Sequence, residues 1–469
     1  MEKNIGRCKF LSTVPAMTAL GSAMLSQSCK SENIKEQTKA GTIQDPIETG
    51  PIDNLRIGFV GVGNRGSSLA RQLLSIPGCQ IVCVCDLVPE KVQRIQQWVT
   101  EEGYPTPNGY HKDEIDYKRM CENEEFDLVI TATPWELHAP ICIAAMKNGK
   151  HAATEVPGCQ SIDASWELVE TSEKYRRHCM LLENYCYFRE IMAVDNMIRA
   201  GLFGNPLHVY AGYQKEAMYY QVKADGSLTF SGEGHNNSYG NVYPTHHGGP
   251  SARWMDINRG DCFDYLVSMG NGNVAFNQYG EERFGEDHPL SNREFLMADI
   301  SNTMIMTKKG RTMHLILDTI LPRPHRHYFR LQGERGIYEH IEKRLHIHGI
   351  SPGKYTGLDG YDHQKDYRQW ESIEQYYDQY DHPLWKKFYD TAKRSGHGGG
   401  DWIMLYTLVK GFNKGAYPDI DVYDLAAWSC LVEVTEISSR NRSKPVDIPD
   451  FTRGKWKNRS PLPIGSLVS

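Results

Sequence analysis

The sequence lacks the patterns by which zinc and thiol redox sites are usually recognised. It has 12 cysteines in 469 residues, yet none forms a Cys-x-x-Cys pair, the spacing typical of structural zinc and of thioredoxin-like sites. Two histidine pairs, His325/His327 and His346/His348, are each separated by one residue, but no Cys, Asp or Glu completes a ligand set around them. We therefore expect no metal site.

Positive charge in excess and long apolar runs are also missing. A net charge of −6 provides no basic surface of the kind that binds phosphate backbones, so we expect no nucleic-acid partner. The apolar stretch 10–25 is too short to span a membrane as a helix. With 40% hydrophobic and 23% charged residues, the composition is that of a globular protein long enough for two domains.

A glycine-rich turn at residues 61–66 is the best-defined motif. An apolar run, 55–60, reads as a buried parallel strand, and residues 67–74 read as the helix that follows. In Gly61-x-Gly63-x-x-Gly66 the first glycine permits a tight turn, the second lets the backbone approach a pyrophosphate, and the third lets helix and strand pack closely. The free N–H groups of the helix start suit phosphate. The predicted cofactor-binding residues here are Gly61, Gly63, Asn64, Arg65 and Gly66.

Asp86 identifies the dinucleotide. It ends the second apolar run, 79–85, twenty residues after Gly66, where a ribose-binding carboxylate is expected. Such an acid favours NAD, because it would repel the 2′-phosphate of NADP. The alternative is a doubly wound sheet that binds no nucleotide.

Two further strands, predicted over 126–133 and 149–155, bring candidate residues to the carboxyl edge of the sheet, where ligands bind in such folds. Trp135 and His138 follow the first of them, and Glu155 ends the second. We expect Trp135 to lie near the nicotinamide. His138 is either a cofactor contact or a capping or core histidine, and Glu155 is either cofactor-facing or a helix-cap acid. Another strand is predicted over 180–187, which would bring Asn184, Tyr185 and Tyr187 to the same edge.

The pattern changes after Pro206. Alternating apolar runs without regular intervening helices indicate a mainly antiparallel sheet, whereas residues 222–241 read as a polar loop. Tyr243 and His246 follow this loop, beside proline and paired glycines; they are either site residues or loop residues that pack on Pro244. We predict an α/β protein: a doubly wound parallel sheet (54–187) followed by a second α+β domain (188–469).

The N-terminus is typical of an export segment. Basic residues precede the short apolar stretch, and Cys29 follows it, much as in a bacterial lipoprotein. We expect residues 1–29 to be a signal or lipoprotein segment and 30–53 to be a flexible linker. Export to the periplasm, or a lipid anchor, would then be the only link to a membrane; a disordered tail of a cytoplasmic protein is the alternative.

Taken together, the motifs resemble the Gfo/Idh/MocA oxidoreductase superfamily, in which a Rossmann domain precedes an open-faced sheet. The closer resemblance is to the NAD-dependent α-N-acetylgalactosaminidase family of glycoside hydrolases, and it covers about residues 54–460. The segments that carry it are 182–187 (LENYCY), 240–246 (GNVYPTH), 255–260 (MDINRG), 380–385 (YDHPLW), 396–399 (GHGG), 421–426 (DVYDLA) and 449–456 (PDFTRGKW).

This resemblance implies a mechanism. Bound NAD⁺ takes hydride from the sugar C3, the ketone acidifies the C2 proton, and loss of that proton expels the C1 substituent. Water then adds and the ketone is reduced again, so no pair of carboxylates is needed, unlike in most glycosidases. The resemblance also implies the open-faced sheet could pair in a homodimer.

The family's site residues map onto this chain by motif. The resemblance implies that His246 and Tyr187 transfer protons, that Tyr243 positions the sugar, and that Glu155 faces the cofactor. The alternative for Tyr187 is a core tyrosine with a satisfied hydroxyl. His397, in the Gly-His-Gly-Gly segment, either contacts the cofactor or marks a turn.

Three departures bear on the activity. The superfamily's dehydrogenases carry a lysine where this chain has Val156, which argues against a plain sugar dehydrogenase. The closer family has a substrate-contacting arginine in an insert, but none lies between Tyr219 and Gly240, and His325 stands where the family has a tyrosine. A carbohydrate-binding protein on an inactive enzyme fold is therefore a third hypothesis, and N-acetylgalactosamine is only the family's default sugar.

Overall fold

The computed structural model describes residues 47, 49–353, 368–416 and 418–468. The predicted export segment, 1–29, and most of the predicted linker, 30–53, lie outside the described residues. No helix within these ranges is long and apolar enough to cross a membrane. Residues 44–469 form one compact unit, so the division after residue 187 stays a prediction.

A six-stranded parallel sheet occupies the first half of the chain, in the order β3-β2-β1-β4-β5-β6. Its central strands are short apolar runs buried on both faces, as parallel strands covered by helices must be. The strand order reverses beside β1, and ligands bind at the carboxyl ends of strands at such a point. This confirms the predicted Rossmann sheet. The strands are β1 (Leu55–Val60), β2 (Cys79–Cys85), β3 (Asn108–Tyr110), β4 (Leu128–Thr131), β5 (His151–Thr154) and β6 (Cys179–Leu181).

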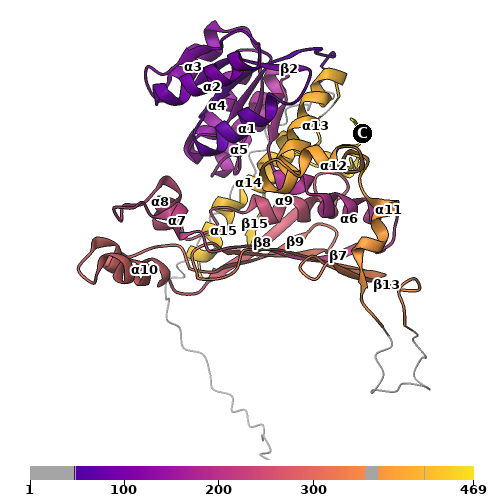
Figure 1. Cartoon of the computed structure of the whole chain (residues 1–469). Helices are drawn as coiled ribbons and strands as arrows, with labels where there is room; N and C mark the ends of the chain where they lie inside the picture. Colours follow the sequence, from indigo (N-terminus) through magenta and orange to yellow (C-terminus); the bar gives the residue numbers. More distant parts are fainter. Residues whose placement is uncertain (1–46, 48, 354–367, 417, 469) are drawn as a thin grey trace, which may run out of the picture. The chain divides into compact units, whose positions relative to one another are not determined.

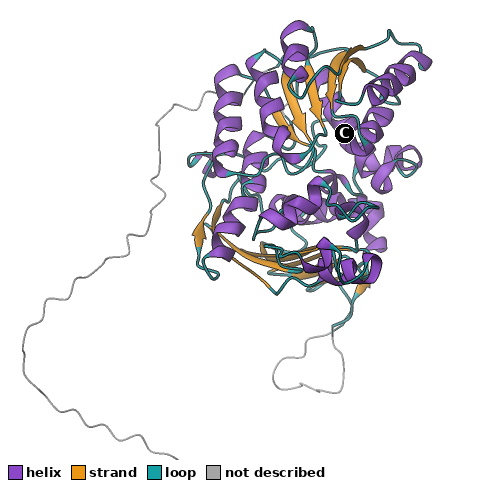
Figure 2. Ribbon diagram, turned by 90° about the vertical axis from the view of Figure 1, so that its left-hand side faces the viewer, coloured by secondary structure: helices purple, strands orange, loops and turns teal. Residues whose placement is uncertain are grey.

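Helices flank this sheet on both faces (Figure 2). They are α1 (Asn64–Leu73), α2 (Pro89–Glu101), α3 (Asp116–Asn123), α4 (His138–Lys147) and α5 (Ile162–Tyr175). The helix α1 begins at Asn64, three residues before the predicted start, because Gly63 already serves as its N-cap. The start of α5 has a chemical cause, since the Ser161 hydroxyl accepts the backbone N–H of Ala164.

The strand predicted over 180–187 is wrong beyond Leu181. There β6 ends, and residues Asn184–Tyr187 form a short 3₁₀ helix, η2, opened by the Glu183 carboxylate, which accepts the backbone N–H of Tyr185 at 3.2 Å. Side chains two apart share a face in a strand but diverge in a 3₁₀ helix, which has three residues per turn. Tyr185 and Tyr187 therefore point in different directions.

The second half of the chain builds a nine-stranded sheet in the order β14-β13-β12-β11-β7-β10-β9-β8-β15. Only β7 and β10 pair in parallel; the other neighbours are antiparallel, as predicted. In the described part of the chain, helices cover one face of this sheet and leave the other open (Figure 1). The strands are β7 (Pro206–Gln214), β8 (Phe263–Gly270), β9 (Ser301–Thr307), β10 (Thr312–Asp318), β11 (Arg326–Gly333), β12 (Gly336–Glu339), β13 (Arg344–Ile347), β14 (Glu371–Ser372) and β15 (Val446–Asp447).

The prediction of a loop over 222–241 is wrong in part, and the alternative that His246 is a loop residue does not hold. The polar stretch 222–241 contains a helix, α8, capped by Thr229, and His246 lies in the first turn of a helix, α9, that packs against β7. The sequence did not indicate this helix, because it contains paired glycines and a proline, which disfavour helices. The helices of this half are α6 (Arg189–Arg199), α7 (Met218–Gln221), α8 (Phe230–Asn237), α9 (Thr245–Trp254), α10 (Ala275–Phe284), α11 (Tyr377–Tyr380), α12 (Pro383–Ala392), α13 (Gly400–Lys414), α14 (Val422–Ser429) and α15 (Leu431–Arg440).

One helix of the second half returns to the first. The helix α13 packs beside α1, where the Trp402 indole N–H donates to the Ser75 hydroxyl at 3.0 Å. At the far end of α13, the Asn413 amide donates to the Gly78 carbonyl at 2.9 Å. The C-terminal half therefore packs along α1, the helix that follows the glycine-rich turn.

Candidate active site

The glycine-rich turn has the geometry of a dinucleotide cradle. Gly61 has φ +80°, and a Cβ there would lie 2.9 Å from the Ala132 carbonyl oxygen; a Cβ on Gly66 would lie 1.9 Å from the Gly61 carbonyl oxygen. By contrast, a Cβ on Gly63 would meet nothing within 4 Å. No side chain caps the start of α1, so the N–H groups of its first turn remain available to a ligand. The turn therefore fits a pyrophosphate, which needs close backbone approach and free N–H donors.

Asp86 lies directly after β2, beside this turn. Its two carboxylate oxygens accept the backbone N–H groups of Val62 at 2.9 Å and Val88 at 3.0 Å. Lys91 approaches the same carboxylate at 3.6 Å. These contacts fix the carboxylate at the edge of the turn, the position predicted for a ribose contact.

Arg65, in the first turn of α1, joins the two halves of the protein. Its guanidinium donates to Glu155 at 2.7 Å and, through two nitrogens, to Asp401 at 2.6 and 3.0 Å. Burial acts against this charge, but the two carboxylates outweigh it and raise the pKa of Arg65. Because Glu155 follows β5 and Asp401 opens α13, the cluster locks the cofactor turn to the C-terminal half.

His397 completes this cluster from the 3₁₀ segment Gly396–Gly399. Its Nδ1 lies 2.8 Å from the Asp401 carboxylate. Burial alone would raise the pKa of that carboxyl, yet the hydrogen bond to His397 and the charge of Arg65 hold it well below its usual range. The Asn184 amide donates to the other oxygen of Asp401 at 2.7 Å. Sequence reasoning singled out His397 and placed Asn184 at this edge of the sheet, but it missed Asp401; the i, i+4 spacing of His397 and Asp401 at a helix start was the available signal.

His246 lies on the sheet side of the site and pairs with a buried acid. Its Nδ1 is 2.7 Å from the Glu183 carboxylate, which is 0% exposed. Burial raises the pKa of Glu183 to about 8 and lowers the pKa of His246. The charges of Glu155 and Arg65 also act on His246, so this pair adjoins the cofactor cluster. Glu183 was not singled out in the sequence.

The charge state of Glu183 decides which proton His246 carries. An ionised Glu183 accepts Nδ1–H and leaves Nε2 with a lone pair, whereas a protonated Glu183 donates to Nδ1 and leaves Nε2–H. Within the described residues, no hydrogen bond occupies Nε2. This nitrogen can therefore take or give a proton on the site side.

Aromatic rings surround His246. Tyr185 stacks on it with ring centroids 4.2 Å apart, while Tyr213 and Tyr243 each lie 5.0 Å away. Trp135 packs on Tyr243 at 5.7 Å. The structure thus brings together three predicted residues, Trp135, Tyr243 and His246, and adds Tyr185 and Tyr213. Burial raises the pKa of Tyr185 and Tyr243 well above 10, so these phenols stay protonated unless a cation is bound beside them.

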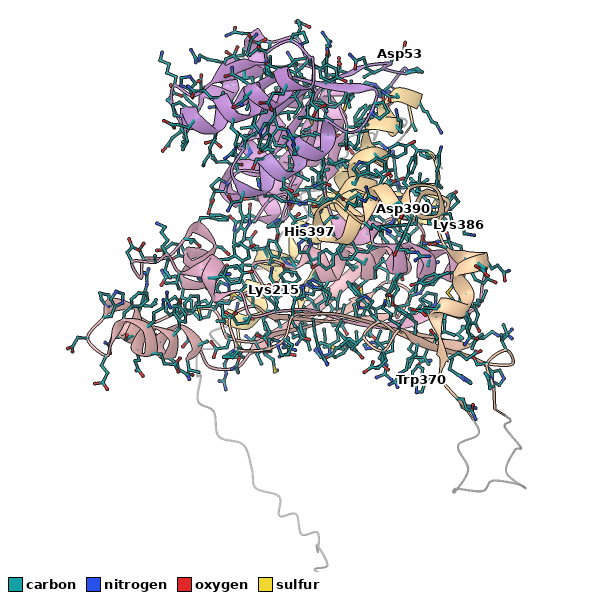
Figure 3. All side chains as sticks on the ribbon, in the orientation of Figure 1. Asp53, Lys215, Trp370, Lys386, Asp390 and His397 are labelled. Carbon is teal, nitrogen blue, oxygen red and sulfur yellow. The ribbon has the colours of Figure 1, made fainter. Side chains whose placement is uncertain are left out.

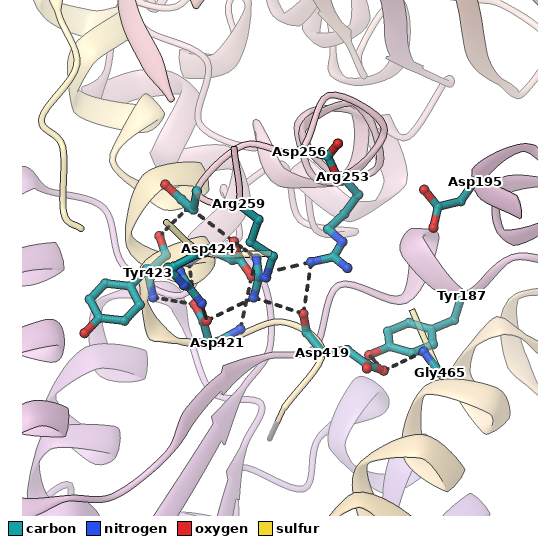
Figure 4. A network of polar contacts seen from close by, with 12 residues as sticks. Tyr187, Asp195, Arg253, Asp256, Arg259, Asp419, Asp421, Tyr423, Asp424 and Gly465 are labelled. Carbon is teal, nitrogen blue, oxygen red and sulfur yellow. Dashed lines mark hydrogen bonds and ion pairs between the residues drawn. The ribbon is translucent and has the colours of Figure 1, made fainter. Parts of the chain in front are cut away.

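Tyr187 does not belong to this cluster. It is 0% exposed, and its hydroxyl donates to the Asp419 carboxylate at 3.4 Å, next to the ion pairs of Arg259 with Asp421 and Asp424 (Figure 4). The prediction that Tyr187 transfers protons is corrected: it is a core tyrosine with a satisfied hydroxyl. The physical reason is the 3₁₀ helix, which turns Tyr185, not Tyr187, toward His246.

His138 is likewise a core histidine and not a cofactor contact. It is 1% exposed at the start of α4, and its two ring nitrogens lie 2.7 Å from the Pro157 carbonyl and 2.9 Å from the Thr133 carbonyl. Burial lowers its pKa. With both nitrogens directed at backbone oxygens, His138 holds the turn after β4 against the turn after β5, and the predicted cofactor contact is corrected to a core histidine.

Two family models divide the chain between them. Residues 55–183 match the oxidoreductase family model described as an NAD-binding Rossmann fold, and residues 187–458 match the model for the C-terminal domain of glycosyl hydrolase 109. The first model agrees with the cradle described above, and the chain therefore carries an NAD-binding Rossmann domain.

Similar proteins extend over nearly the whole chain. The "Alpha-N-acetylgalactosaminidase" of Shewanella oneidensis is 35% identical over 466 residues, covering 98% of this chain and 99% of its own length. The "Glycosyl hydrolase family 109 protein" of Solibacter usitatus is 39% identical and covers 88% of this chain and 91% of its own length. Among solved structures, a levoglucosan dehydrogenase in complex with NADH and L-sorbose aligns with a TM-score of 0.61 at 17% identity, over 85% of this chain and 100% of that one; this likeness concerns the fold. The chain is a member of glycosyl hydrolase family 109.

Proposed function

We propose that this chain is an NAD-dependent glycosidase that acts by oxidation, elimination and re-addition. The observation that supports this best is that the acidic side chains of the site are already paired with basic ones. Glu155 and Asp401 are bound to Arg65, and Glu183 is bound to His246. An ordinary glycosidase needs two carboxyl groups flanking the sugar, one of them as proton donor to the leaving group; here the acids of the site are committed to other partners beside a dinucleotide cradle.

The residues present fit NAD. The turn 61–66 would hold the pyrophosphate, Asp86 the adenosine ribose, and the cluster of Arg65, Glu155 and His397 would border the nicotinamide half. Bound there, NAD⁺ supplies a hydride acceptor for a sugar carbon, which makes the neighbouring C–H acidic. His246 Nε2 is the group placed to move that proton, and Glu183 sets its tautomer. Trp135 and Tyr243 provide flat apolar surfaces that orient a sugar ring.

The default substrate is an α-N-acetylgalactosaminide, because the relative from Shewanella oneidensis carries that activity in its name. The absence of arginine between Tyr219 and Gly240 in the sequence and the presence of His325 indicate that the contacts to the sugar differ from the family's pattern. A neighbouring N-acetylhexosamine or hexose is therefore included in the test.

A second candidate is a sugar oxidoreductase that releases NADH, because the fold is shared with a levoglucosan dehydrogenase and a fold alone does not decide between the two reactions. Val156 argues against it, because this position offers no lysine to take the hydroxyl proton. A carbohydrate-binding protein without turnover is the third candidate.

The test is cleavage of a panel of 4-nitrophenyl glycosides by the purified full-length chain in deuterated water. We expect release of 4-nitrophenol with deuterium at the sugar C2 and no net NADH. His246→Gln should abolish release while NAD stays bound, whereas Tyr187→Phe, which alters a hydroxyl outside the site, should leave it intact. NADH that accumulates without glycoside cleavage would establish the dehydrogenase instead, and sugar binding without either product would establish the third candidate.

A further inference from the structure

A line of three side chains runs from the centre of the site to its rim. The Tyr185 hydroxyl lies 2.9 Å from Nδ1 of His327 and also contacts its Nε2, and His327 Nε2 lies 2.5 Å from Nε2 of His325. Exposure rises along this line: Tyr185 is 2% exposed, His327 is half-buried and His325 is exposed. Its inner end is the ring that stacks on His246.

One arrangement of hydrogens uses the contact of Tyr185 with His327 Nδ1 and the contact of His325 with His327 Nε2, and it leaves the contact of Tyr185 with Nε2 unused. The Tyr185 O–H donates to His327 Nδ1, and His327 Nε2–H donates to His325 Nε2, which leaves His325 Nδ1 for water. This requires both imidazoles to be neutral. Burial, followed by the charges of His325 and His246, lowers the pKa of His327 to about 2, and burial with the charge of Lys215 lowers the pKa of His325. Both rings are therefore uncharged at neutral pH.

The charged and titratable groups around the line keep it uncharged. Lys215, which follows β7, acts on both histidines, and its ammonium lies over the Tyr213 ring at 5.0 Å; Figure 3 places it on the helix side of the second sheet. Tyr213 itself stacks on His327 at 5.3 Å. His340 contributes from beyond β12, and His397 acts on His325. Each of these groups, when positively charged, disfavours a positive charge on His325 or His327.

We propose that Tyr185, His327 and His325 form a proton relay between the sugar hydroxyl that is oxidised and solvent. This rests on the proposed function. When the sugar C–H gives its hydride to NAD⁺, the hydroxyl on that carbon loses a proton to the Tyr185 oxygen. The Tyr185 proton passes to His327 Nδ1, the Nε2 proton of His327 passes to His325, and the Nδ1 proton of His325 leaves to water. The same steps run backwards when the ketone is reduced.

The relay explains two features that the proposed function leaves open. Val156 removes the superfamily's lysine, so the hydroxyl proton needs another acceptor, and a phenol whose pKa is raised by burial cannot keep a net charge. A relay needs no charged intermediate, because each member gives up one proton as it accepts another. His325 then provides the exit at a position where the resemblance implied a tyrosine.

The test uses His325→Ala and His325→Gln in the full-length chain, with His346→Ala as a matched control on β13, where the ring contacts a backbone carbonyl. In dilute non-basic buffer, both His325 variants should lose about tenfold or more in kcat at unchanged KM. Added imidazole should restore kcat of His325→Ala, in proportion to its concentration, without affecting the wild type or the control. Restoration by a small base distinguishes proton transfer from a structural role.

In a second experiment the same variants are mixed with sugar, and two signals are followed together. One is the reduction of bound NAD, and the other is the release of a proton to a pH indicator dye. In the wild type the two should coincide, and in His325→Ala proton release should lag until imidazole is added. A chain that reduces NAD but cleaves no glycoside refutes the proposed function and still reports on the relay. Unchanged kcat in both variants, or a loss that imidazole does not restore and that raises KM, would overturn the relay.

Discussion

Replacement of Glu183 by glutamine should change how the stability of this protein depends on pH. The usual pKa of a glutamate is 4.5, and burial raises that of Glu183 to about 8. Between these values the unfolded chain has released the proton and the folded chain still holds it. Stability contributed by the protonated group is therefore fully present below about pH 4.5 and is lost as pH rises through about 8, by roughly 5 kcal/mol over the whole interval.

His246 limits the window in which this loss is visible. Burial lowers its pKa below 6.5, so the unfolded chain binds a proton there that the folded chain does not, and stability from this group increases as pH rises toward 6.5. The two slopes oppose each other below about pH 6.5. Between about pH 6.5 and 8 only Glu183 still changes the stability, which falls by about 2 kcal/mol across this window.

The assay is the urea midpoint of the wild type and of Glu183→Gln across that window. The wild type should lose stability relative to Glu183→Gln as pH rises, while Glu233→Gln, a change at a partly exposed acid that pairs with Arg293, should run parallel to the wild type. Activity should follow the same group: kcat of the wild type should rise through about pH 8, as Nε2 of His246 gains its lone pair, and Glu183→Gln should lack this limb. Parallel stability curves for wild type and Glu183→Gln would refute the assignment of a raised pKa to Glu183.

Four further changes test the site. His246→Gln should lower kcat by about 10²–10⁴ with bound NAD unchanged by absorbance; a rise in KM alone would contradict a role in proton transfer. Gly63→Ala should fold, since its Cβ has open space, but weaken NAD binding by about tenfold or more (about 1.4 kcal/mol) in calorimetry; unchanged affinity would place the pyrophosphate elsewhere. Asp401→Asn leaves Arg65 with one carboxylate and should destabilise the fold by about 3 kcal/mol, read by chemical unfolding, with weaker NAD binding. Tyr187→Phe should cost about 1 kcal/mol and leave kcat within twofold, because its one hydrogen bond is long; a large loss of kcat would return Tyr187 to the site.

The cofactor half was readable from sequence because its physics is local. A tight turn, a close backbone approach and a helix start occupy six consecutive residues: Gly61 and Gly66 have no room for a Cβ, and Gly63 borders open space. Asp86 was equally accessible, since strand length fixes its distance from the turn. The first sheet followed from continuous apolar runs and the second from apolar alternation.

The substrate half was less readable because its contacts are long-range. Glu183 and His246 are 63 residues apart in sequence, and no local pattern tells a buried acid from a cap. Tyr187 was predicted in place of Tyr185 because a short 3₁₀ helix was interpreted as a strand. Glu183, which caps the start of that helix, was the residue that the sequence did not reveal as a cap. For His138, burial between two carbonyl groups outweighed the position at the sheet edge.

The contact between Arg65 and Asp401 joins residues 336 positions apart and sets a condition for building chimeras. An exchange of the first half of this chain for that of a dehydrogenase, with the joint placed after β6, would carry the glycine turn across but leave behind the helix that anchors it. We expect such hybrids to bind the dinucleotide weakly unless α13 is transferred as well. The cofactor site is therefore built from two separate segments of the chain. Recombination within this fold should preserve cofactor binding only where the first half and α13 are exchanged together.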